Sequence, residues 1–122
     1  MDVRIIVKND VRIAMIDSSE VIISDGQTAL DCAATILYEH DCQAIAMCKA
    51  AITEDFFRLS TGVAGEIAQK FVNFRFCLAI IGDFSEYTSK PLRNFIYESN
   101  RGRHLFFVSD ENTAVDRLSA IG

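Results

Sequence analysis

The chain has 122 residues, of which 50% are hydrophobic and 24% are charged, and this composition is typical of a folded domain rather than a disordered segment. The length suits one hydrophobic core, so we expect a single domain over residues 1–122. A net charge of −5 and the absence of a lysine- and arginine-rich stretch argue against a nucleic-acid partner. No apolar run is long enough to cross a membrane, so we expect a cytoplasmic protein without a membrane partner.

The first forty residues predict a hairpin followed by a helix. Two runs rich in β-branched residues, 3–7 and 11–16, flank an Asn-Asp turn, which is typical of an antiparallel hairpin. Residues 21–23 predict a shorter extended segment. Ser24 and Gln27 have the spacing of a capping box, so a helix is expected to begin there. Its predicted buried positions are Leu30, Ala33, Ala34 and Leu37.

The middle of the chain alternates between short apolar runs and a second helix. Residues 44–48 predict a buried strand, and residues 52–57 predict a loop that ends in two phenylalanines. A helix is expected at about 62–73, and the continuous apolar run 76–81 predicts a strand that is buried on both faces. The predicted buried side of this helix carries Val63, Ile67, Phe71 and Phe74.

The last third predicts a helix, a strand and a final helix. Pro91 follows Ser89 and Lys90, and proline is tolerated in the first turn of a helix. Residues 105–108 predict the last strand, and Asp110 is expected to cap the last helix. The inner positions of the two helices are predicted to be Leu92, Phe95, Ile96 and Ser99, then Ala114, Val115 and Leu118. The element order β-β-α-β-α-β-α-β-α predicts an α/β fold with a mixed sheet, in which right-handed crossovers join parallel strands.

This element order resembles that of STAS domains, which occur as anti-sigma-factor antagonists and as the tails of sulfate transporters. Their functional serine begins the second helix, and the switch motif of the antagonists is similar to Ser60-Thr61-Gly62 here. The chain departs from that motif, because Leu59 replaces an acidic residue and Gly65 lies three rather than two residues after the first glycine. The resemblance implies a STAS-like regulatory domain that binds a protein partner and is switched at the hydroxyl.

A second resemblance rests on longer strings. ITEDFF, LSTGVAGEIAQKF, AIIGDFSEYTSK and FIYESNRG look like an uncharacterised bacterial family that is catalogued as domain of unknown function 4180. This likeness spans most of the chain and implies no particular activity.

Polar residues are expected to gather where the parallel strands end, because these ends and the following helix starts share one edge of the sheet. The residues expected at this edge are Asp55, Ser60, Thr61, Gly62, Gly82, Asp83, Ser85, Lys90, Ser109 and Asp110. A hydroxyl at the start of the second helix serves either as a plain helix cap or as a phosphoacceptor. Backbone N–H groups near Gly62 offer a third alternative, anion binding, although the lysine of a phosphate-binding loop is missing.

Two carboxylates and three aromatic residues raise further alternatives. Asp55 and Asp83 are hypothesised to form an acid pair, and the alternative for Asp83 is a bond to the nearby turn. Phe56 and Phe57 cannot both face a core from an extended segment, so we expect one of them to be exposed and to mark a contact surface. Tyr87 raises the same possibility, and the alternative for all three is that they anchor their loops.

The four cysteines do not indicate a metal site or a cofactor. No C-x-x-C motif occurs, and the chain has only two histidines, so no cofactor and no metal are expected. Cys42 follows His40 by two residues, and a cysteine near a histidine raises the hypothesis of a catalytic nucleophile. Two side chains at this spacing near a helix end need not face each other, which argues against that role. The cysteines expected to behave as small apolar residues are Cys32, Cys48 and Cys77.

Three function hypotheses follow, and none of them names a reaction. The leading one is a non-enzymatic regulatory or interaction domain whose partner surface comprises residues 52–62, the start of the second helix and residues 83–90. The alternative is an anion- or nucleotide-binding protein, or an enzyme, at the carboxyl edge of the sheet; its residues would be Asp55, Thr61, Asp83 and Lys90. The third is self-association through the hairpin edge, which would give a homo-oligomer.

Overall fold

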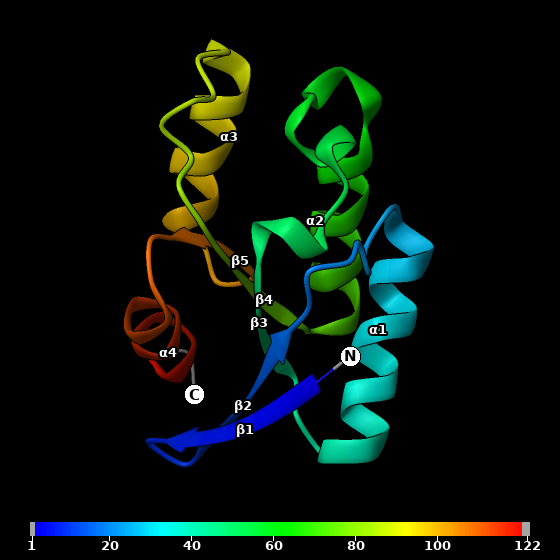
Figure 1. The fold of residues 1–122 in the computed structure, drawn as a ribbon, viewed down its shortest axis with the longest axis vertical. Helices are drawn as coiled ribbons and strands as arrows, with labels where there is room; N and C mark the ends of the chain where they lie inside the picture. Colours follow the sequence, from blue (N-terminus) through cyan, green and yellow to red (C-terminus); the bar gives the residue numbers. More distant parts are fainter. Residues whose placement is uncertain (1, 121–122) are drawn as a thin grey trace.

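The computed structural model describes residues 2–120 and contains a five-stranded mixed sheet and four α-helices (Figure 1). The strands are β1 (Asp2–Lys8), β2 (Val11–Asp17), β3 (Ala44–Cys48), β4 (Cys77–Ile81) and β5 (Leu105–Val108). The α-helices are α1 (Gly26–His40), α2 (Val63–Phe74), α3 (Lys90–Asn100) and α4 (Glu111–Ser119). Short 3₁₀ helices lie between β3 and α2: η1 (Lys49–Ala51), η2 (Glu54–Phe57) and η3 (Leu59–Thr61). The predicted α/β class is confirmed. None of the helices within residues 2–120 combines the length and the apolar character needed to cross a membrane.

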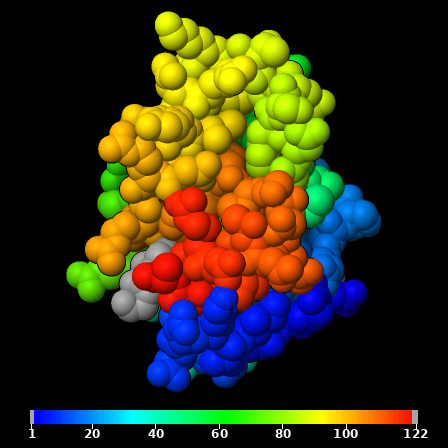
Figure 2. All heavy atoms as spheres, turned by 90° about the vertical axis from the view of Figure 1, so that its left-hand side faces the viewer, coloured from blue at the N-terminus to red at the C-terminus, as the bar shows by residue number. Residues whose placement is uncertain are grey.

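The predicted hairpin is confirmed and forms one edge of the sheet. β1 and β2 pair antiparallel, with Lys8 opposite Val11. Asn9 and Asp10 connect them, and their φ angles of 52° and 64° are those of a two-residue type I′ turn. Both residue types tolerate this left-handed conformation, which explains why a hairpin forms without glycine. Figure 2 shows the hairpin as the blue lower rim of the molecule, with α4 directly above it.

The strands lie in chain order, β1-β2-β3-β4-β5, and β2 to β5 are all parallel. Right-handed crossovers that step in one direction place their helices on one face, so α1, α2 and α3 share a face and α4 covers the other. Two separate cores reflect this arrangement, because alternate residues of β3 enter different cores. Ile45 and Met47 pack with α1 and α2, whereas Ala44 and Ala46 pack with α4. In Figure 1, α1 and α2 lie on the side of the sheet away from α4.

The cap and the buried positions of α1 differ from the prediction by about one residue. Asp25, not Ser24, is the cap: its carboxylate accepts a 2.8 Å bond from the Thr28 N–H, and the Thr28 hydroxyl accepts one from the Asp25 N–H. The capping box therefore ends at Thr28 rather than Gln27. The buried face of α1 also differs from the predicted one, because Leu37 is 36% exposed. The residues that face the core include Ala29, Cys32, Ala33 and Ile36. Ala34 is also exposed.

The predicted buried side of α2 is correct except at its end. Ile67 and Phe71 are buried, but Phe74 is 53% exposed. Phe74 is the last helical residue, and the left-handed Arg75 turns the chain there. Phe76 then packs against Phe71, with ring centroids 5.8 Å apart, and takes the place that the prediction gave to Phe74.

The predicted starts of α3 and α4 are confirmed. The Ser89 hydroxyl accepts a bond from the Leu92 N–H and Pro91 lies in the first turn of α3. Asp110 caps α4, with its carboxylate 2.7 Å from the Thr113 nitrogen. Leu92 is buried in the face covered by α1–α3, as predicted.

The segment before α1 is joined to the segment after β3. Residues 21–23 do not form a strand of the sheet. Within residues 2–120, their one strand-like contact is a single parallel bridge between Ile23 and Ile52. The Gly26 N–H also donates a 3.1 Å bond to the Glu66 carboxylate on α2. A Cβ at position 26 would lie 2.2 Å from that carboxylate oxygen, so any larger residue there would displace the Glu66 side chain. These contacts hold the starts of α1 and α2 together at the carboxyl edge of the sheet.

Candidate functional site

The hydroxyl of Thr61 is a structural element of the turn before α2. Its Oγ1 lies 2.7 Å from the carbonyl oxygen of Asp55 and 2.8 Å from that of Arg58, and it accepts a 3.3 Å bond from the Val63 N–H. One hydroxyl thus joins η2, η3 and the first residue of α2. Neither hydroxyl predicted as a cap occupies the N-cap position, but Thr61, one residue before it, accepts the bond from the first N–H of α2.

Ser60 does not cap the helix. The N-cap position of α2 belongs to Gly62, whose φ angle of 81° lies in the left-handed region and whose Cβ position faces open space. Ser60 is exposed in the middle of η3, and its hydroxyl has no hydrogen-bond partner among residues 2–120. The structure therefore separates the two predicted hydroxyls into one that holds the turn and one that faces solvent.

Lys49 organises the carboxyl edge and was not among the predicted site residues. Its Nζ lies 2.5 Å from Glu86 Oε1, 3.1 Å from the Asp83 carbonyl oxygen and 4.8 Å from the centre of the Tyr87 ring. The hydrogen bond to Glu86 raises the pKa of Lys49 above its ordinary value. Gly82 allows this approach, because a Cβ there would lie 3.0 Å from the Lys49 stem. The position of Lys49 directly after β3 was the one sequence signal that could have placed it at this edge.

Both loop phenylalanines are buried, so the expectation that one of them is exposed is wrong. Phe56 is 0% and Phe57 is 4% exposed. The prediction assumed an extended segment, whereas η2 is a 3₁₀ helix in which neighbouring side chains diverge by about 120° rather than 180°. Phe56 packs against Phe95 on α3, and Phe57 stacks on Tyr87 with ring centroids 4.8 Å apart. These residues anchor the loops.

Tyr87 closes residues 83–90 onto η2. Its hydroxyl donates a 2.9 Å bond to Glu54 Oε1. Burial, together with this bond, raises the pKa of the Tyr87 phenol. The surface predicted from residues 52–62 and 83–90 is therefore one connected unit, held by Lys49, Phe57 and Tyr87.

The predicted acid pair does not form. Asp83 Oδ1 accepts bonds from the Ser85 hydroxyl at 2.7 Å and the Ser85 N–H at 2.9 Å, and these bonds lower the pKa of Asp83. Asp55 is exposed, and within residues 2–120 no contact joins its carboxylate to Asp83. Lys90 is likewise exposed at the start of α3 and contacts neither acid. Lys49, not Lys90, is the lysine at the strand ends.

A hollow of about 580 Å³ lies where β4 and β5 end. Its polar lining includes Asp83, Ser109 and Thr113, and Arg117 enters from α4. The connection after β4 runs to the face covered by α1–α3, whereas the connection after β5 runs to the opposite face. Strand ends whose connections diverge in this way form the crevice in which α/β sheets usually bind ligands.

Seven of the ten predicted edge residues, including Asp55, Thr61 and Lys90, lie outside this hollow. A separate hollow of about 460 Å³ lies at the ends of β2 and β3. Arg4 crosses its mouth and binds Asp17 at 2.8 Å and Glu111 at 2.5 Å. The carboxyl edge therefore carries two separate hollows rather than one continuous site.

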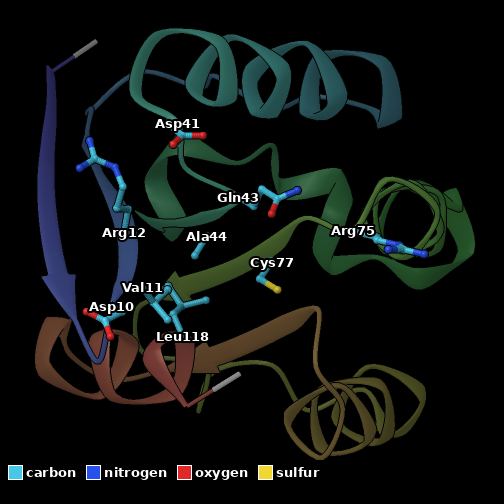
Figure 3. Close-up of a pocket in the computed structure, with 9 residues that line it drawn as sticks. All are labelled: Asp10, Val11, Arg12, Asp41, Gln43, Ala44, Arg75, Cys77 and Leu118. Atoms are coloured by element: carbon cyan, nitrogen blue, oxygen red, sulfur yellow. The ribbon is translucent and has the colours of Figure 1, made fainter. Parts of the chain in front are cut away.

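The opposite edge of the sheet carries a hollow of about 450 Å³ that the sequence analysis did not identify (Figure 3). Arg12, Asp41, Gln43 and Arg75 stand around it, with Cys77 on its floor. In Figure 3, the guanidinium groups of Arg12 and Arg75 lie on opposite sides and do not converge on one point. The arrangement is therefore unsuited to clamping a single anion between two arginines.

The cysteines differ in exposure. Cys42 is buried, and its thiol contacts the His40 carbonyl oxygen at 3.4 Å rather than the imidazole. Burial raises the pKa of Cys42, which argues against a nucleophile. Cys48, expected to be a buried apolar residue, is exposed at the end of β3, and Cys77 is half-buried. Among residues 2–120, no three His, Cys, Asp or Glu side chains are grouped to hold a metal ion.

Comparison with known proteins identifies the family. A family model described as Domain of unknown function (DUF4180) matches residues 8–118. The chain belongs to this family. The search of curated proteins and the search of solved structures gave no match.

The matched range of this DUF4180 protein contains β2 to β5 and all the predicted site residues. Only Lys8 of β1 falls within it. The family model therefore covers the Ser60 turn and the hollow after β5, whereas the edge strand lies almost wholly outside it.

Proposed function

We propose that this protein is a STAS-like, non-enzymatic regulatory domain that binds a protein partner and is switched by modification of Ser60. The observation that carries the proposal is the exposed Ser60 hydroxyl on η3, next to a Thr61 hydroxyl that is engaged in the turn. The βα order and the position of a serine before the second helix are similar to those of the anti-sigma-factor antagonists. The partner surface comprises residues 52–62, the start of α2 and residues 83–90.

A phosphate on Ser60 would change this surface without disturbing the fold. The exposed hydroxyl is available to a modifying enzyme, and the turn keeps its Thr61 bonds when Ser60 is altered. A phosphate adds about −1.5 to −2 charges at pH 7. Glu54 and Asp55 in η2 already supply negative charge on the same surface. The modified surface would repel an acidic partner and attract a basic one.

The loops that present this surface are preorganised. The Phe57–Tyr87 stack and the Lys49–Glu86 bond fix residues 83–90 against η2. A preformed surface avoids the entropic cost of ordering loops on binding. This rigidity favours a binding role over a mobile catalytic loop.

The test is quantitative partner capture from the native host with wild-type protein and two variants. Ser60→Asp should change the yield of a specific partner severalfold, and Ser109→Asp, which adds the same charge at the start of α4, should not. Intact-mass analysis of the captured protein should show a phosphoryl increment that Ser60→Ala removes. Equal partner yields for Ser60→Asp and wild type, together with no increment on Ser60, would refute the switch.

A second candidate function is small-ligand binding in the hollow after β5, and its supporting observation is the divergence of the β4 and β5 connections there. Of the residues first considered for this alternative, only Asp83 lines the hollow. A thermal-shift screen of nucleotides, inorganic anions and acyl compounds tests it. A ligand at one hundred times its Kd should add about 2.7 kcal/mol to the free energy of unfolding, and Thr113→Tyr should abolish that gain. A panel without any stabilising compound would count against this function.

A further inference from the structure

β1 is an edge strand whose outer side carries no neighbouring strand in the described part of the chain (Figures 1 and 2). Such an edge presents backbone N–H and C=O groups that another strand can bind. Proteins commonly block these edges with proline, a bulge or charged side chains. The two cations of β1, Arg4 and Lys8, are held against α4 by ion pairs. β1 contains no proline, and its register with β2 is continuous from Asp2 to Lys8. Its outer edge is therefore suited to pairing with a further strand.

The hairpin turn determines which backbone groups face outward. Lys8 and Val11 flank the two-residue type I′ turn, so they form a hydrogen-bonded pair. Pairs alternate along an antiparallel ladder, so the even-numbered residues of β1 bond to β2. The residues whose N–H and C=O groups point away from β2 are therefore Val3, Ile5 and Val7. A partner strand must place its own outward residues opposite these three.

The two faces of β1 differ in character. Arg4 and Lys8 bond to Glu111 and Asp116 on α4, so the even-numbered side chains lie on the α4 face. Val3 and Ile5 pack on the core beneath α1–α3. Val7 lies on that same face of the strand and is 58% exposed. The edge thus combines a charged row on one face with an apolar row on the other.

We propose that two copies of this chain pair antiparallel through β1, about a two-fold axis at Ile5. Asp2 of each copy then faces Lys8 of the other at both ends of the strand. On the opposite face, Val3 faces Val7 and Ile5 faces its symmetry mate, which covers the exposed Val7. The outward N–H and C=O groups of these apolar residues bond to one another, and the two sheets become continuous.

Charge favours this register over the two neighbouring registers that use the same outward groups. A register centred on Arg4 places two Arg4 side chains directly opposite each other. A register centred on Ile6 places Arg4 opposite Lys8 at both ends. Like charges in directly opposite positions destabilise a strand pair, whereas opposite charges stabilise it. The contact is isologous and closed, so pairing stops at the dimer.

The experiment measures self-association of the full chain by sedimentation equilibrium over a wide concentration range. The wild type should show a monomer–dimer equilibrium. Asp2→Lys and Lys8→Glu should each weaken dimerisation on the order of tenfold, because each variant opposes like charges at both ends. An equimolar mixture of the two variants should dimerise again, since each mixed pair restores opposite charges. Glu98→Lys on α3 makes the same charge change as Asp2→Lys away from the edge and should leave the dimer unchanged.

Hydrogen exchange gives a second readout at backbone level. The amides of Val3, Ile5 and Val7 should become protected as the concentration rises, whereas those of Arg4 and Ile6 should be protected at every concentration. A wild type that stays monomeric at its solubility limit would overturn the proposal. A dimer that both charge variants leave unchanged, or a mixture that associates no better than either variant alone, would overturn this register. None of these results depends on Ser60.

Discussion

Replacement of Thr61 by valine should destabilise the fold, whereas removal of the neighbouring Ser60 hydroxyl should not. Valine keeps the shape of threonine and loses its hydroxyl. The lost contacts are those to the Asp55 and Arg58 carbonyl oxygens and to the Val63 N–H. One hydroxyl can donate to one carbonyl at a time, so about two bonds are lost together. Water replaces them at this exposed site, so we expect the lower part of the usual range, about 1 kcal/mol.

Thermal and urea denaturation of Thr61→Val, Ser60→Ala and wild type measure this difference. For a domain of this size, 1 kcal/mol corresponds to a fall in Tm of roughly 4 °C. Ser60→Ala deletes a hydroxyl that has no partner within residues 2–120, so its stability should stay within about 0.5 kcal/mol of wild type. Equal stability of Thr61→Val and Ser60→Ala would refute the division into one structural and one free hydroxyl. The proposed switch at Ser60 would lose its structural argument at the same time.

Other predictions concern two glycines, a cap and a thiol. Gly26→Ala should lower the free energy of unfolding by about 1 kcal/mol, because the new Cβ displaces the Glu66 carboxylate that binds the Gly26 N–H. Gly65→Ala has open space at its Cβ position and should stabilise α2 by about 0.5–1 kcal/mol. Urea denaturation of the two variants measures both changes. Hydrogen bonds from Thr28 hold the pKa of Asp25 below its ordinary value. The stabilisation from Asp25 is therefore present above the unfolded-state pKa of about 3.9 and is lost as the pH falls through the lower folded-state pKa, so Asp25→Asn should flatten the acid limb of stability against pH. Cys48 should react first with a thiol reagent in the native state, and peptide mapping should find slower labelling at the less exposed Cys32, Cys42 and Cys77.

Secondary structure was predictable wherever the signal was local. The Asn9-Asp10 turn, Pro91 at the start of α3 and Asp110 at the start of α4 each satisfy backbone constraints of their own segment. The start and the buried face of α1 were harder to predict, because Ser24 and Asp25 are adjacent and both residue types are good N-caps. The contact between Gly26 and Glu66, forty residues away in the chain, accompanies the later start. The local Asp25–Thr28 capping box and this long-range contact both accompany the start at Gly26, and a single sequence does not display the second of them.

The candidate site was harder to predict than the fold because its contacts join distant segments. Lys49 and Glu86 are 37 residues apart, and neither lies in a motif. The burial of both Phe56 and Phe57 depends on a 3₁₀ helix, which requires knowledge of the backbone between β3 and α2. Thr61 was recognised as a candidate, but its role follows only from the position of the Asp55 and Arg58 carbonyl groups. The sequence therefore located the edge and left the roles of its residues open.

The topology of the sheet separates the two functions that remain for this edge. Because the strands lie in chain order, the connections after β2, β3 and β4 all run to one face, and only the connection after β5 leaves for the other. The divergence at β4 and β5 therefore places the hollow beside Ser109 and Thr113, whereas Ser60 stands between β3 and α2. A ligand in the hollow would contact α4, and a protein partner at Ser60 would contact η3 and α2. Ser60→Asp should then change partner binding and leave ligand binding unaltered, while Thr113→Tyr should do the reverse, so the two hypotheses fail independently.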